Sequence, residues 1–208
     1  MRYHPNHPMV VAATLFAILV IQTPSTPAAD VAPAADVAPA PSVIKSGPAP
    51  GATIQSFFVR AVTGPHRNRS VCYVCRYGSR PVVMVLMQRI DPNVAELLKT
   101  IDEIVDENRV VGLRSFGVLV TDESSTVVPI LQTLAFDERI RTPLAAATTA
   151  IAGSGANNLH REATTTIVLY RHQKAVQSLA FERGELDSES IDDVAKAIAR
   201  LLDDASDS

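Results

Sequence analysis

Two cysteines, Cys72 and Cys75, are the residues of this sequence whose type and spacing most directly suggest chemistry. With two residues between them, they can close a small disulfide ring wherever the chain turns, and the same pair can exchange two electrons as dithiol and disulfide. Cationic residues surround the pair, with the run His66–Arg69 before it and Arg76 and Arg80 after it. Because positive charge favours a thiolate over a thiol, these side chains would raise the reactivity of the sulfurs.

The spacing leaves three interpretations of the pair open: a redox couple, a structural disulfide, and a metal site or free thiols. Zinc would need two further ligands, and His66 is the only histidine nearby. Covalent haem attachment is disfavoured because Arg76, rather than a histidine, follows Cys75. We therefore expect no metal and no cofactor. The run His66–Arg69 could bind an anionic ligand, although such runs are more often solvated loops.

The local pattern raises a conformational problem for a bridge. Val71, Tyr73, Cys75 and Tyr77 alternate as they would in a strand. A strand would place the two sulfurs on opposite faces with their residues about 10 Å apart, at ~3.3 Å per residue, whereas a disulfide needs Cα atoms within about 7 Å. A bridge therefore requires a turn here, and Gly78 lies too far along the chain to supply it.

Composition narrows the classes of protein that this chain can be. The 208 residues include 19 Lys and Arg against 22 Asp and Glu, for a net charge of −3, and 47% of them are hydrophobic. This balance excludes a strongly basic nucleic-acid binder and a charge-dominated disordered chain. Two cysteines are also too few to build a disulfide scaffold, so the folded part must depend on a hydrophobic core.

The first 50 residues are expected to lie outside that core. Arg2 precedes an uncharged apolar run, Met9–Ile21, and small residues follow it, which is typical of a secretory signal peptide over residues 1–29. An Ala/Pro-rich linker over 30–50 follows, in which the hexapeptide Ala-Asp-Val-Ala-Pro-Ala occurs twice. We expect a protein exported to the periplasm or the extracellular space, with a membrane contact only if the signal segment stays uncleaved.

Residues 51–205 have the length of one domain, and their pattern predicts its elements in order. Pro81–Met87 is an unbroken apolar run typical of a central parallel strand. Asp91 is placed to cap a helix that begins at Pro92 and ends near Asn108. Further along, the pattern predicts strands at 113–121 and 142–148, helices at 124–135 and 190–202, a loop at 149–162, and a hairpin of 164–171 and 175–182 joined by His172, Gln173 and Lys174.

This order of elements predicts an α/β fold with a central mixed sheet flanked by helices. The stretch Phe57–Met87, FFVRAVTGPHRNRSVCYVCRYGSRPVVMVLM, is similar to the pattern of the thioredoxin-like superfamily, particularly its peroxiredoxin-like (AhpC/TSA) branch. The hairpin and final helix of Thr164–Leu202 match the second half of that pattern. The chain also resembles exported bacterial thioredoxin-like proteins. The resemblance implies a thioredoxin-like fold over 51–205.

The chain departs from this superfamily at the positions that would carry its chemistry. Thioredoxins place the Cys-x-x-Cys motif after the central strand, where this chain has Gln88–Asp91 and no sulfur. A proline usually precedes the hairpin, where Ala163–Thr165 stand instead. We therefore transfer no catalytic residue from the family.

Two functional hypotheses follow from the sequence. In the first, the protein is an exported thiol–disulfide oxidoreductase whose partners are protein thiols or disulfides. By analogy with other Cys-x-x-Cys enzymes, Cys72 would attack and Cys75 would resolve, while Arg76 and Arg80 lower the thiol pKa. In the second, the protein is no enzyme but a binding or structural module in which the disulfide only holds the chain. The sequence does not indicate an oligomeric state.

Overall fold

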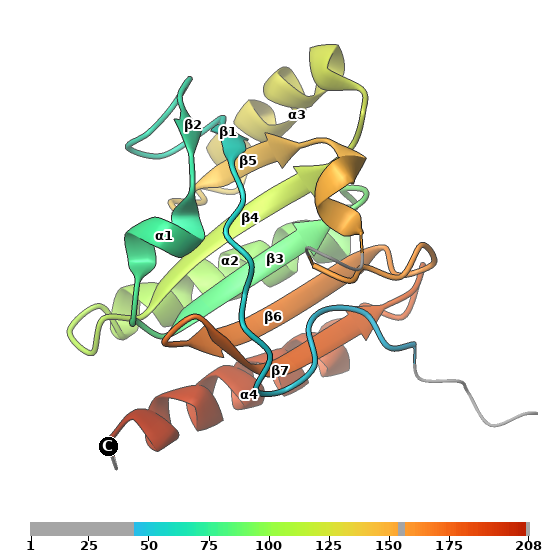
Figure 1. The fold of residues 1–208 in the computed structure, drawn as a ribbon. Coiled ribbons are helices and arrows are strands. Elements are labelled where there is room, and N and C mark those ends of the chain that lie inside the picture. Colours follow the sequence, from blue (N-terminus) through green and yellow to red (C-terminus); the bar gives the residue numbers. More distant parts are fainter. Residues whose placement is uncertain (1–43, 154–156, 207–208) are drawn as a thin grey trace, which may run out of the picture. The chain divides into compact units, whose positions relative to one another are not determined.

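The computed structural model describes residues 44–153 and 157–206, so the expected signal peptide and most of the expected linker lie outside the described residues. The described part forms a seven-stranded sheet in the order β2-β1-β5-β4-β3-β6-β7, with helices on it (Figure 1). In chain order the elements are β1 (Val59–Ala61), β2 (Ser70–Val71), α1 (Tyr73–Tyr77), β3 (Val82–Met87), α2 (Pro92–Glu107), β4 (Arg114–Val120), α3 (Ser124–Asp137), β5 (Leu144–Ala147), the 3₁₀ helix η1 (Thr149–Ala152), β6 (Thr165–Arg171), β7 (Lys174–Phe181) and α4 (Ser188–Ser206).

The sheet is mixed, as the sequence predicts. β3 pairs in parallel with β4, from Val82 opposite Arg114 onward, and antiparallel with β6 on its other side. β4 also pairs in parallel with β5, whereas β1 is antiparallel to both β5 and β2. The central position of β3 explains its unbroken apolar sequence, because both of its faces are covered.

The two faces of the sheet support two separate hydrophobic clusters. Odd-numbered residues of β3 pack against buried residues of α2, α3 and α4, and even-numbered ones pack with residues of α1 and of the segment that leads into β1. In Figure 1 that segment crosses the sheet on the face opposite α2 and α4. Alternate side chains of a strand point to opposite faces, so one apolar run serves both clusters.

Helix α2 begins and ends where the sequence predicts. In α2 the Asp91 carboxylate accepts a hydrogen bond from the Val94 amide at 3.1 Å, Pro92 occupies the first turn, and the helix ends at Asn108. The position of Pro92 is favourable because a first-turn residue has no intrahelical N–H partner to lose.

The hairpin and the last helix differ from the prediction in detail. Lys174 belongs to β7, so only His172 and Gln173 connect β6 to β7, with φ angles of 51° and 57°. Two positive φ angles are the signature of the tight hairpin turn that matches strand twist. At α4, the carboxylate of Asp187 accepts from the Ser190 amide at 2.8 Å and caps a helix that begins at Ser188, two residues before the predicted start at 190.

The folded part begins ahead of Gly51. The Ser46 hydroxyl is buried and lies 2.7 Å from the Thr166 hydroxyl, and it also accepts from the His160 amide at 3.0 Å. The Pro48 carbonyl accepts from the Ser178 hydroxyl at 2.8 Å. Within the described ranges, none of the helices combines the length and the apolar character needed to cross a membrane.

A buried carboxylate on α2 is hydrogen-bonded to the residues just before β5. Asp102 is 8% exposed and accepts hydrogen bonds from the Thr142 amide at 2.7 Å, the Thr142 hydroxyl at 3.1 Å and Arg141 Nε at 3.2 Å. A buried donor that loses such an acceptor keeps the full cost of its desolvation.

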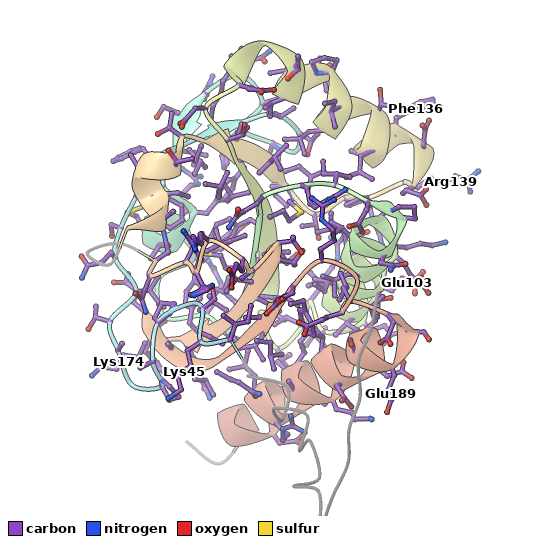
Figure 2. The ribbon with its side chains drawn as sticks, turned by 90° about the vertical axis from the view of Figure 1, so that its right-hand side faces the viewer. Lys45, Glu103, Phe136, Arg139, Lys174 and Glu189 are labelled. Carbon is purple, nitrogen blue, oxygen red and sulfur yellow. A yellow bond between two sulfur atoms is a disulfide. The ribbon has the colours of Figure 1, made fainter. Side chains whose placement is uncertain are left out.

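We therefore expect Asp102→Ala to lower the free energy of unfolding by about 2–3 kcal/mol, because it leaves the buried Thr142 amide without an acceptor and removes a charged partner of Arg141. Glu103→Ala is the matched control: Glu103 is the neighbouring acidic residue and points outward from α2 in Figure 2, so its loss should cost less than about 0.5 kcal/mol. Urea denaturation of both variants measures the difference. Equal costs would show that the buried carboxylate does not hold this junction.

Candidate functional site

The two cysteines lie on the short helix α1, which connects β2 to the loop before β3. Cys72 is the N-cap of this helix and Cys75 is its third residue, and the two are joined in a disulfide with a Cα–Cα separation of 5.3 Å. The helix supplies the turn that the bridge requires, so the alternation through Tyr73 and Tyr77 does not form a strand here. Gly78 instead ends the helix, with φ of 60°.

The two cysteine residues differ in their exposure to solvent. Cys72 is 5% exposed and belongs to the hydrophobic cluster on this face of the sheet, whereas Cys75 is exposed. The Cys75 amide donates a hydrogen bond to Cys72 Sγ at 3.1 Å. This order of exposure is the reverse of what an attacking Cys72 and a resolving Cys75 would need.

An aromatic layer lies beneath α1. The ring of Tyr73 stacks on that of Phe116 from β4 with centroids 5.0 Å apart, and it lies 5.6 Å from the ring of Tyr77. The Tyr77 hydroxyl donates to the Ser115 carbonyl at 3.2 Å. Burial raises the pKa of both tyrosines above the ordinary value, with Arg76 acting in the opposite direction. The two phenols therefore stay uncharged at neutral pH and give Cys72 an apolar support.

Exposed arginines flank the two cysteines in the chain. Arg67, Arg69, Arg76 and Arg80 are exposed, and none of them takes part in the ion pairs found among the described residues. The charges of Arg76 and Arg80 are close enough to lower the pKa of Tyr77, against the larger effect of burial. Of the cations predicted around the cysteines, Arg76 lies on the same short helix as Cys75, and a positive charge close to a sulfur favours its thiolate form.

The histidine considered as a zinc ligand has an aromatic neighbour instead. The His66 ring lies 6.4 Å from the ring of Tyr73. No group of three or more His, Cys, Asp and Glu residues that could hold a metal ion occurs in the stretches 44–153 and 157–206.

The other end of β3, where α2 begins, is where thioredoxins carry their cysteines. Here the Gln88 side chain donates to the carbonyls of His160 at 3.2 Å and Ala163 at 2.9 Å, and its amide donates to the Thr164 carbonyl at 2.9 Å. Figure 1 shows α1 near the start of β3, whereas the arrowhead of β3, after which the chain continues to α2, is at the other end of the strand. Six residues of strand, or about 20 Å at ~3.3 Å each, separate the disulfide from this position.

The aromatic layer is the part of the site that the sequence analysis missed. Tyr73 and Tyr77 are four residues apart, which places them on one face of a helix. That spacing indicates the helix α1. Over only five residues, however, the same sequence also fits the alternating pattern of a strand, so the spacing does not decide between the two.

Comparison with known proteins supports the fold. No protein-family model matches the sequence, and no curated protein matches it. Among solved structures, a protein assigned as the thiol:disulfide interchange protein DsbE of Chlorobium tepidum is 9% identical, with a TM-score of 0.55 over 74% of this chain and 98% of its own. A secreted disulfide oxidoreductase of Mycobacterium tuberculosis, homologous to DsbE of E. coli, is 10% identical, with a TM-score of 0.52 over 69% and 95%.

Peroxiredoxin-type structures match as well. Peroxidoxin BcpB of Mycobacterium tuberculosis is 16% identical, with a TM-score of 0.50 over 74% of this chain and 96% of its own. At these identities the likeness concerns the fold. The thioredoxin-like α/β fold predicted from the sequence is confirmed, and peroxiredoxin-type structures are among those that share it.

The unequal burial of the sulfurs leads to a prediction about their reactivity. After mild reduction of the folded protein, we expect iodoacetamide to modify Cys75 at least about ten times faster than Cys72, because the thiolate must be accessible to react. Peptide mapping by mass spectrometry measures both rates in one sample. The same measurement in urea is the control, since unfolding removes the difference in burial. Equal rates in the folded protein would contradict the placement of Cys72 in the core.

Proposed function

We propose that the protein is an exported thiol–disulfide oxidoreductase that reacts through Cys75 and Cys72. The observation that carries the proposal is the disulfide itself: it joins an exposed sulfur to a buried one within a helix whose solvent side is cationic. When only one sulfur of a disulfide is accessible, a partner thiolate can attack only that sulfur. The same cysteine then always forms the mixed disulfide.

The geometry supports the following exchange step. A thiolate of a partner attacks Cys75 Sγ and forms a mixed disulfide, while the Cys72–Cys75 bond breaks and its electron pair remains on Cys72 Sγ. The Cys75 amide already donates a hydrogen bond to that sulfur, so the departing thiolate has a donor in place. A second thiolate of the partner then attacks the partner's own sulfur in the mixed disulfide and releases Cys75. The partner loses two electrons and two protons, and both cysteines gain them as thiols.

The roles of the two cysteines in this proposal are the reverse of the order taken from other Cys-x-x-Cys enzymes. Cys75 meets the partner because it is exposed, and Cys72 acts as the internal leaving and resolving group because it is buried. Arg76 follows Cys75 directly and stabilises negative charge at the sulfurs. The solved structures named as disulfide oxidoreductases share the fold, and the activities stated in their names are consistent with protein thiols or disulfides as partners of this chain.

The second candidate function is a non-catalytic module in which the disulfide holds α1 in place. It is favoured by one specific observation: Cys72, Tyr73 and Val74 all belong to the hydrophobic cluster, as a purely structural tie would require. The two candidates differ in the reduction potential of the pair, because structural disulfides have potentials below about −300 mV.

We expect the wild-type protein to catalyse the reduction of insulin by dithiothreitol and its disulfide to have a potential above about −300 mV. Each of Cys72→Ser and Cys75→Ser should abolish turnover. With an oxidised partner, Cys72→Ser should accumulate a mixed disulfide and Cys75→Ser should not, because only Cys75 is exposed. Ser79→Ala, in the exposed loop after α1, is the control and should retain full activity. A potential below −300 mV together with no turnover would establish the structural role.

Export is a part of the proposal that rests on the sequence of the first 29 residues. Expression of the full chain in a bacterium should yield a periplasmic product whose intact mass corresponds to cleavage near Ala28 or Ala29. Phe16→Arg, which puts a charge in the apolar run, should leave the chain uncleaved in the cytoplasm, whereas Phe16→Leu should be processed normally. A wild-type product that keeps Met1–Ala29 in the soluble cytoplasmic fraction would refute export.

A further inference from the structure

A cavity of about 360 Å³ opens at one end of the strands, between the end of α1, the C-terminal part of α2, the first residues of β4 and the residues just before β5. Three guanidinium groups line it, those of Arg109, Arg114 and Arg141. It does not include either cysteine, so what it binds is a question separate from the thiol chemistry.

The positive charges of the cavity exceed the negative charges that neutralise them. Arg141 pairs with Asp102 at 3.2 Å and with Asp106 at 3.0 Å, and Arg109 pairs with Asp106. Arg114 is in none of the ion pairs of the described residues, and its hydrogen bond goes to the Leu113 carbonyl at 2.7 Å. Two carboxylates thus stand against three guanidinium groups, and one positive charge is left for a ligand.

The hydroxyl groups that line the cavity cannot donate a hydrogen bond to a ligand, because each already donates within the protein. Thr142 gives its single hydroxyl proton to Asp102, so in the 2.7 Å contact between the Ser115 and Thr142 hydroxyls the donor is Ser115. The Tyr77 hydroxyl donates to the Ser115 carbonyl. The donors that stay available are guanidinium N–H groups, of which each arginine has five. Such forks match an oxyanion, and a carboxylate can bind one in a bidentate manner.

The remaining wall of the cavity is apolar. Pro65, Val105 and Pro143 line it together with the half-buried ring of Tyr77. A site with one surplus positive charge and an apolar wall suits an ion with one negative charge and an apolar body, and its volume lies at the small end of ligand sites. We propose that this cavity binds a small organic monocarboxylate, with its carboxylate on Arg114 and its apolar part against Tyr77 and Val105.

Benzoate is a probe with these properties, and benzamide is its uncharged counterpart of the same shape. In ¹⁵N-labelled full-length protein, benzoate should produce saturable shifts of the Tyr77, Val105 and Arg114 amides, with an affinity at least about tenfold above that of benzamide. Inorganic phosphate should bind at least about tenfold more weakly than benzoate, since it cannot use the apolar wall. Saturation by phosphate at equal concentration, or no saturation by benzoate at tens of millimolar, would overturn the proposal.

Substitution of the unpaired arginine locates the binding. Arg114→Gln should weaken benzoate about tenfold or more, because one charge-assisted contact is lost. Arg183→Gln removes the same charge from an exposed position outside the cavity and should leave the affinity unchanged. Since Arg114 is half-buried, circular dichroism must show that the variant is folded; if it is not, Arg109→Gln, on a more exposed side chain, should weaken benzoate at least about threefold. Full affinity in a folded Arg114→Gln, or in Arg109→Gln where that variant is needed, would refute the assignment.

Discussion

The burial of β3 on both faces is the constraint on which the rest of the domain depends. An apolar strand can lie at the centre of a sheet only when both faces are covered. On one face the cover consists of the helices α2, α3 and α4. The other face is covered by the chain that leads into β1 and by α1. Helix α1, which carries the cysteines, therefore covers part of the hydrophobic core. Cys72 is buried because of that position and not because of the chemistry of its sulfur.

Much of this fold could be predicted from the sequence because its signals extend over many residues. The apolar run of β3 and the helical stripe of α2 are each long enough to fix their own type, and Asp91 with Pro92 marks the start of the helix. The site could be predicted only as a pair of cysteines among cations. A five-residue helix such as α1 satisfies both a helical and an extended pattern, and the packing of Tyr73 on Phe116, 43 positions further along the chain, decides between them. No local pattern contains that contact.

The placement of the sulfurs separates this chain from thioredoxins. At the start of α2, where thioredoxins carry their reactive pair, Gln88 occupies the space with hydrogen bonds to the backbone ahead of β6. At the opposite end of the same strand, the disulfide, the arginines and the aromatic layer occur together. Function is a property of such sites rather than of folds, so the two ends of one scaffold can differ in what they do.

The attachment of Cys72 to the core has a thermodynamic consequence. Oxidation of the pair and unfolding of the domain form a closed thermodynamic cycle. The free energy by which the disulfide stabilises the native state against unfolding therefore equals the free energy by which folding favours the oxidised pair over the reduced pair. Closing a ring of only four residues lowers the conformational entropy of the unfolded chain. In the chain-entropy account, this stabilises the native state by roughly 2 kcal/mol. At 1.4 kcal/mol for about 30 mV, that stabilisation corresponds to a potential roughly 40 mV lower than that of the same pair in the unfolded chain. Replacements in the layer beneath α1 that change native stability unequally in the two redox states would move this potential without touching a sulfur atom.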